Sequence, residues 1–204
     1  MIIIEKNNKV LSKVKVSGGG RCNVTNNAAT VAELCNGYPR GAKFLRTLFQ
    51  QFNNQDTMQW FKDRGVKLKA EPDGRMFPVT DNSQTIVDCL LDEAYRLKIS
   101  VETGVGVNKI YKTEFGFELK LLNGGTILAD RVVVASGGHP QQAGYEWLTK
   151  LGLKTESPVP SLFTFNVPDS PFHELSGVAV QNAKVKISGT KLEEKGPLLF
   201  THWG

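Results

Sequence analysis

The spacing of apolar residues changes along the chain, from helical spacing in much of the first half to alternation in the second. The chain opens with a β-branched run, Ile2–Ile4, closed by Glu5, and this pattern is typical of a buried parallel strand. Apolar residues three and four positions apart predict helices over 42–52, 56–65 and 83–97. The first half therefore combines an early strand with several helices.

Capping and turn residues refine these boundaries. The helix over 56–65 is expected to start at an Asp56 cap and to end at Gly65, and the helix over 83–97 to start at Asp81 or Ser83. Residues on both sides of Pro72-Asp73-Gly74 alternate between apolar and polar, which predicts a hairpin.

From residue 100 onward the pattern favours strands. A meander of two or three antiparallel strands is predicted over 105–135, and its last apolar run, 131–135, ends at Ser136-Gly137-Gly138. A short helix over 145–152 follows, and then Pro-punctuated strands over 157–168 and 178–189 and a strand over 198–204. The order of elements predicts an α/β fold with a domain boundary near residue 157.

Composition agrees with an ordinary globular protein. The 204 residues are 40% hydrophobic and 22% charged, enough for a sizeable core and for one domain plus part of another. No run approaches the roughly 20 apolar residues of a membrane span, and the opening residues do not form a signal peptide. Cys22, Cys35 and Cys89 are widely spaced, which indicates neither a disulfide framework nor a zinc cluster and favours a cytoplasmic location.

The net charge is +5, and much of the excess lies in a cluster of Lys6, Lys9, Lys13, Lys15 and Arg21. Such a cluster suits nucleic acid, the phosphates of a small cofactor, or simply a solvated surface. No aromatic residues are interleaved with it as a stacking platform requires, so a nucleic-acid partner is not expected. Lys6 and Lys13 are candidate cofactor contacts.

The stretch "SGGGRCNVTN" at 17–26 is the strongest candidate site. Residues Gly18–Gly20 permit positive φ and close approach of a ligand to the backbone, and successive N–H groups there form an anion-binding concavity. Arg21 adds a permanent cation, and Asn23, Thr25 and Asn26 both donate and accept hydrogen bonds. The alternative is a plain flexible turn.

The position of Glu5 is unusual. An acidic residue that closes an early strand normally follows a Gly-rich dinucleotide turn by about 20 residues. Here the strand is the first element, and no G-x-G-x-x-G precedes it.

Several motifs together resemble the HI0933-like (YhiN/BaiN-like) family of NAD(P)/FAD-dependent oxidoreductases. They are Glu5 at its strand end, "SGGGRCNVTN", "DGRMFPVTDNSQTIVDCL" at 73–90, "RVVVASGG" at 131–138 and "GPLLFTHWG" at 196–204. The resemblance implies an incomplete Rossmann-like FAD-binding domain over 1–157, with its antiparallel meander and helical segment. It also implies the beginning of an inserted β-rich domain over 158–204. Because the family starts with a Gly-rich strand turn and continues past "FTHWG", this chain is expected to be an internal fragment.

The resemblance also implies a chemistry and a set of contacts. Hydride would pass from NAD(P)H through FAD to a small organic substrate, with Glu5 on the adenosine ribose, residues 17–26 beside the flavin and Val107 near the adenine. The cofactor-binding residues expected are Glu5, Lys6, Lys13, Ser17, Gly18, Gly19, Gly20, Arg21, Cys22, Asn23, Thr25, Asn26, Val107, Ala135, Ser136, Gly137 and Gly138. A folded but catalytically silent fragment that binds FAD weakly or not at all is the alternative.

The remaining cysteine, histidine and aromatic residues do not indicate a particular reaction. Cys22 has no second cysteine at redox spacing, so it is expected to pack beside the cofactor. His139, His173 and His202 have no evident partner, and no catalytic acid or base can be named. The aromatic residues Phe44, Phe49, Phe52, Trp60 and Phe61 are interpreted as core, with the wall of a flat apolar pocket as the alternative.

Overall fold

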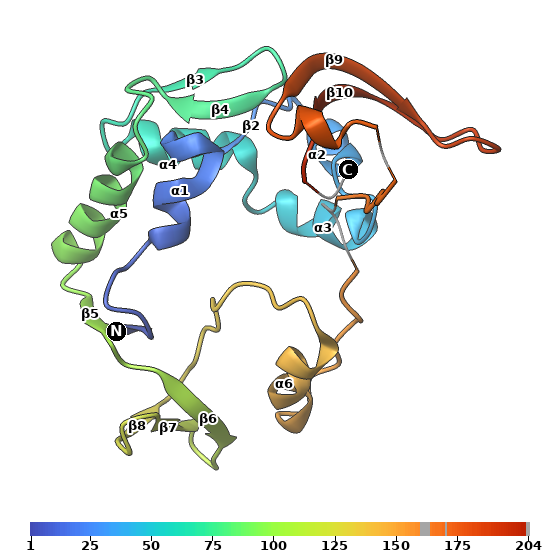
Figure 1. The fold of residues 1–204 in the computed structure, drawn as a ribbon. Helices are drawn as coiled ribbons and strands as arrows, with labels where there is room; N and C mark the ends of the chain where they lie inside the picture. The colour runs from blue at the N-terminus through green and yellow to red at the C-terminus, as the bar shows by residue number, and fades with distance from the viewer. Residues whose placement is uncertain (160–163, 170, 203–204) are drawn as a thin grey trace. The chain divides into compact units, whose positions relative to one another are not determined.

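The computed structural model describes residues 1–159, 164–169 and 171–202. The chain divides into two compact units, Met1–Val132 and Val133–Gly204, and each is described by itself. These compact units meet before residue 157. The domain boundary near residue 157 remains a prediction. The order of the elements along the chain is shown in Figure 1.

The first unit is a mixture of short helices and small sheets, as an α/β sequence predicts. Its elements in chain order are β1 (Ile2–Glu5), α1 (Ser12–Gly20), β2 (Thr25–Asn26), α2 (Val31–Asn36), α3 (Ala42–Phe49), α4 (Asn54–Lys62), β3 (Leu68–Ala70), β4 (Arg75–Pro78), α5 (Gln84–Arg96), β5 (Ser100–Thr103), β6 (Val107–Lys112), β7 (Phe117–Leu121) and β8 (Thr126–Ala129).

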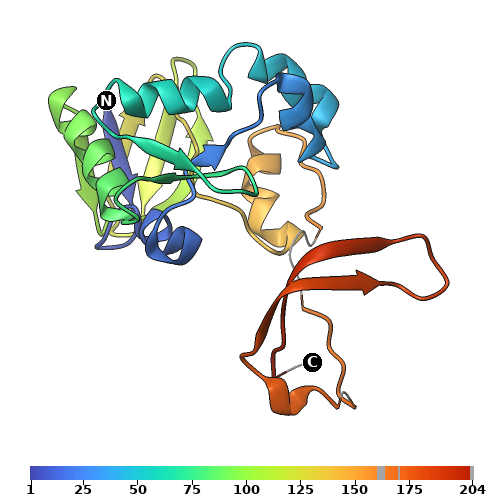
Figure 2. The ribbon, with the colours of Figure 1, turned by 90° about the horizontal axis from the view of Figure 1, so that it is seen from above.

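The predicted opening strand is confirmed, and it is parallel. β1 pairs with β5 in register from Ile2 opposite Ser100 to Glu5 opposite Thr103. Figure 2 shows α5 (green) beside this strand pair. The expectation that the strand is buried is wrong, because Ile2 and Ile3 are exposed in a sheet of only two strands. A parallel strand is covered only when neighbours and helices enclose both its faces.

The core of the unit lies between α1, α4, β3 and α5. It consists of the buried residues Cys22, Phe61, Val66, Ile86 and Cys89, with partly buried Val14, Val24, Trp60, Leu68 and Leu90 packed against them. The hairpin predicted around Pro72-Asp73-Gly74 is confirmed as β3 and β4, with β2 on the other side of β4. Apolar burial on one side of each element explains why these short segments hold together.

Two helix starts differ from the prediction. α4 begins at Asn54 with Asn53 as its cap, and Asp56 closes a capping box by accepting from the Asn53 backbone N–H. Asp56 thus lies in the first turn, where its charge favours the helix dipole. Ser83 precedes α5, but its hydroxyl donates to the carbonyl of Lys15 instead of capping the helix.

The aromatic residues of the first half do not all enter the core. Phe61 is buried and Trp60 is partly buried, as predicted, but Phe44 is 71% and Phe52 is 56% exposed. Phe44 lies on α3, whose helical spacing defines a face without specifying what covers it, and Phe52 lies beyond the end of α3 at Phe49. The interpretation of Phe44 and Phe52 as core is therefore wrong for this structure.

The meander is confirmed as three antiparallel strands, β6, β7 and β8, in that order. The apolar run at 131–135 is not a strand, contrary to expectation. A buried strand needs a hydrogen-bonded neighbour, and no described strand pairs with these residues. Val133 is accordingly 91% exposed.

The second unit contains η1 (Gln142–Tyr145), α6 (Glu146–Lys150), η2 (His173–Leu175), β9 (Ala179–Lys186) and β10 (Glu193–Leu199). β9 and β10 form an antiparallel hairpin, which confirms the strand predicted after residue 178. Thr164–Val167 do not form the predicted strand, and residues 160–163 of the same prediction lie outside the described part. No helix in the described ranges is long and apolar enough to cross a membrane.

Replacing Lys98 by glycine is expected to stabilise the protein. Lys98 follows α5 with φ 54, and its N–H and that of Ile99 close the helix end on the carbonyls of Tyr95 and Ala94. A left-handed conformation costs a residue with a Cβ about 1–2 kcal/mol, and part of this is offset because glycine is more flexible when unfolded. Urea unfolding should show a gain of about 0.5–1 kcal/mol for Lys98→Gly.

Lys62→Gly provides the matched control, because Lys62 lies in the regular helix α4. This variant should lose about 0.5–1 kcal/mol. A loss of stability in Lys98→Gly would contradict the prediction.

The stability of the first unit should depend on the ionisation of Glu93. Hydrogen bonds from Arg96 and Arg64 lower the pKa of Glu93 from 4.5 to about 2. Because the folded pKa is the lower one, the carboxylate stabilises the fold above the unfolded pKa, and this contribution is lost as pH falls toward 2. In urea unfolding between pH 7 and pH 2.5, Glu93→Gln should be less stable than the wild type at neutral pH, and the difference should shrink on acidification. A difference independent of pH would contradict this.

Candidate functional site

The predicted glycine turn is present, with an unusual backbone. The helical conformation of α1 breaks at Ser17, and Gly18, Gly19 and Gly20 all adopt positive φ, at 56°, 68° and 83°. Three consecutive left-handed residues are accessible to glycine at little steric cost. The left-handed backbone of the turn therefore explains why glycine occupies positions 18–20.

The three glycines have different surroundings. A Cβ on Gly18 would lie 2.7 Å from Cε1 of Phe77 and 2.9 Å from the backbone nitrogen of Asn23. Nothing lies within 4 Å of a Cβ built on Gly19 or Gly20. Gly18 is thus packed against the hairpin, whereas the next two residues present open backbone to which a ligand can come close.

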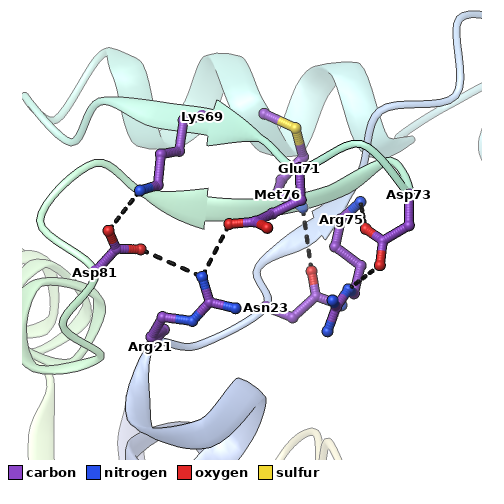
Figure 3. A network of polar contacts seen from close by, with 8 residues as sticks. All are labelled: Arg21, Asn23, Lys69, Glu71, Asp73, Arg75, Met76 and Asp81. Atoms are coloured by element: carbon purple, nitrogen blue, oxygen red, sulfur yellow. Dashed lines mark hydrogen bonds and ion pairs between the residues drawn. The ribbon is translucent and has the colours of Figure 1, made fainter. Parts of the chain in front are cut away.

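Arg21 is joined to the hairpin by its side chain. Its Nη1 lies 2.9 Å from Glu71 Oε1 and 3.5 Å from Asp81 Oδ1, and its Cζ lies 4.0 Å from the centre of the Phe77 ring. Figure 3 shows the guanidinium reaching from the glycine turn to the two carboxylates. The permanent cation predicted at Arg21 is thus paired with two carboxylates, and a direct contact with FAD remains a prediction.

The ionisation of this group of residues follows from its contacts. Hydrogen bonding to Glu71, and then to Asp81, raises the pKa of Arg21. A hydrogen bond from Lys69, 2.5 Å away, and a further one from Arg21 lower the pKa of Asp81. At neutral pH the two cations and two carboxylates balance one another.

Backbone contacts hold the rest of the predicted stretch on β4 and α5. Asn23 accepts a hydrogen bond from the Met76 N–H at 3.2 Å through Oδ1, and Thr25–Asn26 form β2 against β4. The Ser83 N–H donates to the carbonyl of Gly20 at 2.9 Å. Residues 17–26 are thus bonded to β4 and to Ser83, the residue before α5.

An open hollow of about 360 Å³ lies beside the turn. Four of its lining residues, Lys13, Ser17, Cys22 and Asn23, are predicted cofactor contacts. The other lining residues are Val14, Val24, Phe61, Ile86 and Leu90. Its volume lies at the lower end of the range for small-molecule sites and its lining is mainly apolar, but it is an open surface hollow and not an enclosed pocket.

Cys22 is part of both the hollow and the core. It is 6% exposed, has φ 64 and packs in the same cluster as Phe61 and Ile86. The three cysteines are free thiols. The expectation of a packed small residue is met, and its position beside a cofactor remains a prediction.

A second group of predicted residues gathers at the end of β1. Glu5 Oε1 accepts hydrogen bonds from the backbone and side chain of Asn7, at 2.7 and 2.9 Å. Its Oε2 has no partner among the described residues. The carbonyl of Glu5 accepts from the Val105 N–H at 3.0 Å, and a Cβ built on Gly106 would lie 3.3 Å from Lys6 Cγ. The structure thus places Glu5 and Lys6 beside residues 105–106, which directly precede Val107.

The group at the end of β1 does not reach the hollow beside the turn, because Glu5, Lys6 and Val107 are absent from its lining. Ala135, Ser136, Gly137 and Gly138 belong to the second unit. There the Tyr145 hydroxyl accepts from the His139 N–H at 2.6 Å and donates to the His139 carbonyl at 3.0 Å.

Within the described ranges, no cluster of histidine, cysteine and acidic residues suits a metal ion.

Sequence reasoning did not identify Glu71, Phe77 and Asp81 as part of this region. Phe77 is fully buried. These residues lie 50 to 60 positions from Arg21, and neither periodicity nor turn chemistry links them to it. The motif at 73–90, which includes Phe77 and Asp81, was the one available signal.

Comparison with known proteins shows the family. A model described as the HI0933-like protein Rossmann domain matches residues 1–193. The chain belongs to this family. The resemblance drawn from the sequence motifs is thus confirmed, and with it the coarse description of a mixed α/β chain from a family of flavoprotein oxidoreductases.

Curated relatives of this HI0933-like chain have names that describe different substrates. It is 27% identical to a 3-dehydro-bile acid delta(4,6)-reductase of Clostridium scindens, over 100% of the chain and 51% of the relative. It is 29% identical to a ribosomal RNA dihydrouridine synthase of Escherichia coli, over 100% and 52%. A ribosomal RNA dihydrouridine synthase of Haemophilus influenzae is 25% identical, over 99% and 52%. The chain spans about half the length of these relatives.

The residues present fit parts of FAD. The open backbone at Gly19 and Gly20 admits a close ligand, and the apolar hollow offers a surface to a flat ring. Oε2 of Glu5, which accepts from none of the described residues, is available to a ribose hydroxyl. Arg21 fits a phosphate less well, since two carboxylates already neutralise it.

Alanine substitutions should separate the two kinds of glycine. Alanine at Gly18 or Gly19 has to adopt a left-handed conformation, which costs about 1–2 kcal/mol. Only at Gly18 would the methyl group also meet Phe77 and Asn23. Overpacking should therefore make Gly18→Ala less stable than Gly19→Ala by about 1–3 kcal/mol in chemical denaturation. An equal loss in the two variants would contradict the packing.

Proposed function

We propose that this chain forms the FAD-binding part of an NAD(P)H-dependent flavoprotein reductase that acts on an organic substrate. Membership of the HI0933-like family supports the proposal, and so does a relative named as a reductase. The observation that carries it is the left-handed turn at 18–20, with open backbone beside an apolar hollow.

FAD, when bound, supplies transfer of hydride between a reduced nicotinamide and an organic acceptor. The chain supplies contacts and orientation. Glu5 accepts a hydrogen bond from the adenosine ribose through Oε2, the adjoining segment at Val107 lies near the adenine, and Lys6 adds positive charge there. These assignments use the group of residues at the end of β1.

The turn and the hollow provide the flavin end of the proposed site. Gly19 and Gly20 allow close approach of the cofactor, and Asn23, Thr25 and Asn26 are the polar side chains nearest in sequence. Lys13, Ser17 and Cys22 line the open hollow, whose apolar side chains offer a surface for one face of a flat ring. Ala135–Gly138 stay predicted FAD contacts on the resemblance of "RVVVASGG" to the family motif.

We extend the proposal to the domains and the substrate. Residues 1–157 form the FAD/NAD(P)-binding domain, and 158–204 begin a β-rich inserted domain, which the hairpin β9–β10 supports. One relative is named for a bile acid and another for ribosomal RNA, so their names support an organic substrate without choosing between a small molecule and RNA. The expectation that nucleic acid is not a partner remains a prediction, as does the cytoplasmic location.

A titration of the purified chain with FAD, followed by flavin fluorescence, tests the proposal. We expect saturable binding with Kd about micromolar, and weaker binding of FMN, which lacks the adenosine. Glu5→Gln should weaken FAD binding about tenfold and leave FMN binding unchanged, because one charge-assisted hydrogen bond to the ribose is lost.

Glu102→Gln is the matched control, since Glu102 lies on the neighbouring strand β5 opposite Ile4. It should bind FAD as the wild type does. Failure to bind FAD at millimolar concentration would contradict the proposed function, and equal affinity of wild type and Glu5→Gln would contradict the role of Glu5.

A further inference from the structure

The side chain of Arg21 is held by the fold through one end of its guanidinium and one of its faces, and it is 33% exposed. Its guanidinium contacts Glu71 at 2.9 Å, Asp81 at 3.5 Å and the buried ring of Phe77 at 4.0 Å. We propose that Arg21 is a positioning residue whose attachment to Glu71, Asp81 and Phe77 holds the glycine turn in its open, left-handed, ligand-binding shape. This inference rests on the proposed function and assigns to the β3–β4 hairpin a part in cofactor binding.

The turn needs such an attachment because glycine restricts its own conformation least. Gly18, Gly19 and Gly20 are consecutive, so the free turn has access to many backbone conformations. Arg21 follows directly, and its side chain crosses to residues 50 and 60 positions away. Fixing Arg21 fixes the C-terminal end of the turn.

Besides Arg21, two backbone hydrogen bonds hold the turn. The Ser83 N–H donates to the Gly20 carbonyl at 2.9 Å, and the Cys22 N–H donates to the Ser17 carbonyl at 3.0 Å. They set the path of the main chain, but neither joins the turn to the hairpin. The guanidinium does, at residues just beyond β3 and β4 (Figure 3).

Charge balance argues that Arg21 acts through the turn and not as a phosphate ligand. Arg21 and Lys69 face Glu71 and Asp81, so the group carries two positive and two negative charges. A phosphate approaching Arg21 would meet two carboxylates within 3.5 Å of the same nitrogen. The planar face of the guanidinium is in turn covered by Phe77.

The test compares Arg21→Met, the double variant Glu71→Gln with Asp81→Asn, and the triple variant that combines them. Hydrogen exchange of the amides of residues 17–23 without FAD measures the order of the turn, and an FAD titration measures binding. If loosening leaves about a tenth of molecules with a competent turn, the apparent Kd rises about tenfold. The single variant Glu71→Gln provides a milder change should Arg21→Met unfold.

Arg75→Met is the matched control. Arg75 also lies over Phe77, at 5.4 Å, and pairs with a carboxylate, Asp73, at 2.7 Å, but these contacts stay within the hairpin. Arg75→Met should therefore change neither exchange at 17–23 nor FAD affinity.

We expect Arg21→Met and the double variant to accelerate exchange at 17–23 and to weaken FAD binding by similar factors, with no further loss in the triple variant. Unchanged exchange in Arg21→Met would overturn the inference. So would weaker FAD binding in Arg21→Met with wild-type affinity in the double variant, which identifies Arg21 as a direct ligand. If even the wild type binds no FAD, the proposed function fails, while the exchange data alone still decide whether Arg21 orders the turn.

Discussion

The ion pairs of Arg21 with Glu71 and Asp81, formed over the ring of Phe77, constrain the most distinctive part of this molecule. They connect a turn of three left-handed glycines to a hairpin far along the chain. Gly18 fits only because it has no side chain, since a methyl group there would meet Phe77. The same arrangement leaves Gly19 and Gly20 open, so one set of contacts fixes the turn and exposes the backbone that a ligand can approach.

The ion pairs of Arg21 and the apolar packing of the nearby core have different roles around the glycine turn. The buried cluster around Cys22, Phe61 and Ile86 provides apolar stabilisation, while the ion pairs at its edge are partly exposed and contribute mainly direction. The end of β1 follows another logic, because parallel pairing with β5 brings Glu5 beside the segment at Val107. The proposed site therefore depends on two structural features. The glycine turn serves the flavin end of FAD, and the end of β1 serves its adenosine end.

Local signals in the sequence were sufficient for much of the fold. The hairpin at Pro72-Asp73-Gly74, the long helix α5 and the three-stranded meander follow from turn residues and periodicity, which act over a few positions. The start of α4 was misplaced at Asp56 because Asn53 and Asp56 form the two halves of one capping box. The run at 131–135 has the composition of a strand, but composition does not provide a pairing partner.

The candidate site was predictable in its backbone and not in its side-chain partners. Three adjacent glycines before Arg21 indicate left-handed backbone directly, and the structure has it. The engagement of Arg21 was not foreseeable, because Glu71 and Asp81 come close only once the hairpin is folded over the turn. Phe44 and Phe52 illustrate the same limit, since helical spacing predicts one face for both, whereas α3 ends at Phe49 and tertiary packing leaves both side chains exposed.

The central claim is that the end of β1 and the glycine turn bind the two ends of the same FAD molecule. Hydrogen exchange of the 204-residue chain, compared with and without saturating FAD, tests it most directly. The account predicts slower exchange in two separate segments, 5–7 with 104–107 and 17–23, at the same FAD concentration. Protection confined to one of these segments, or found only elsewhere in the chain, would contradict it.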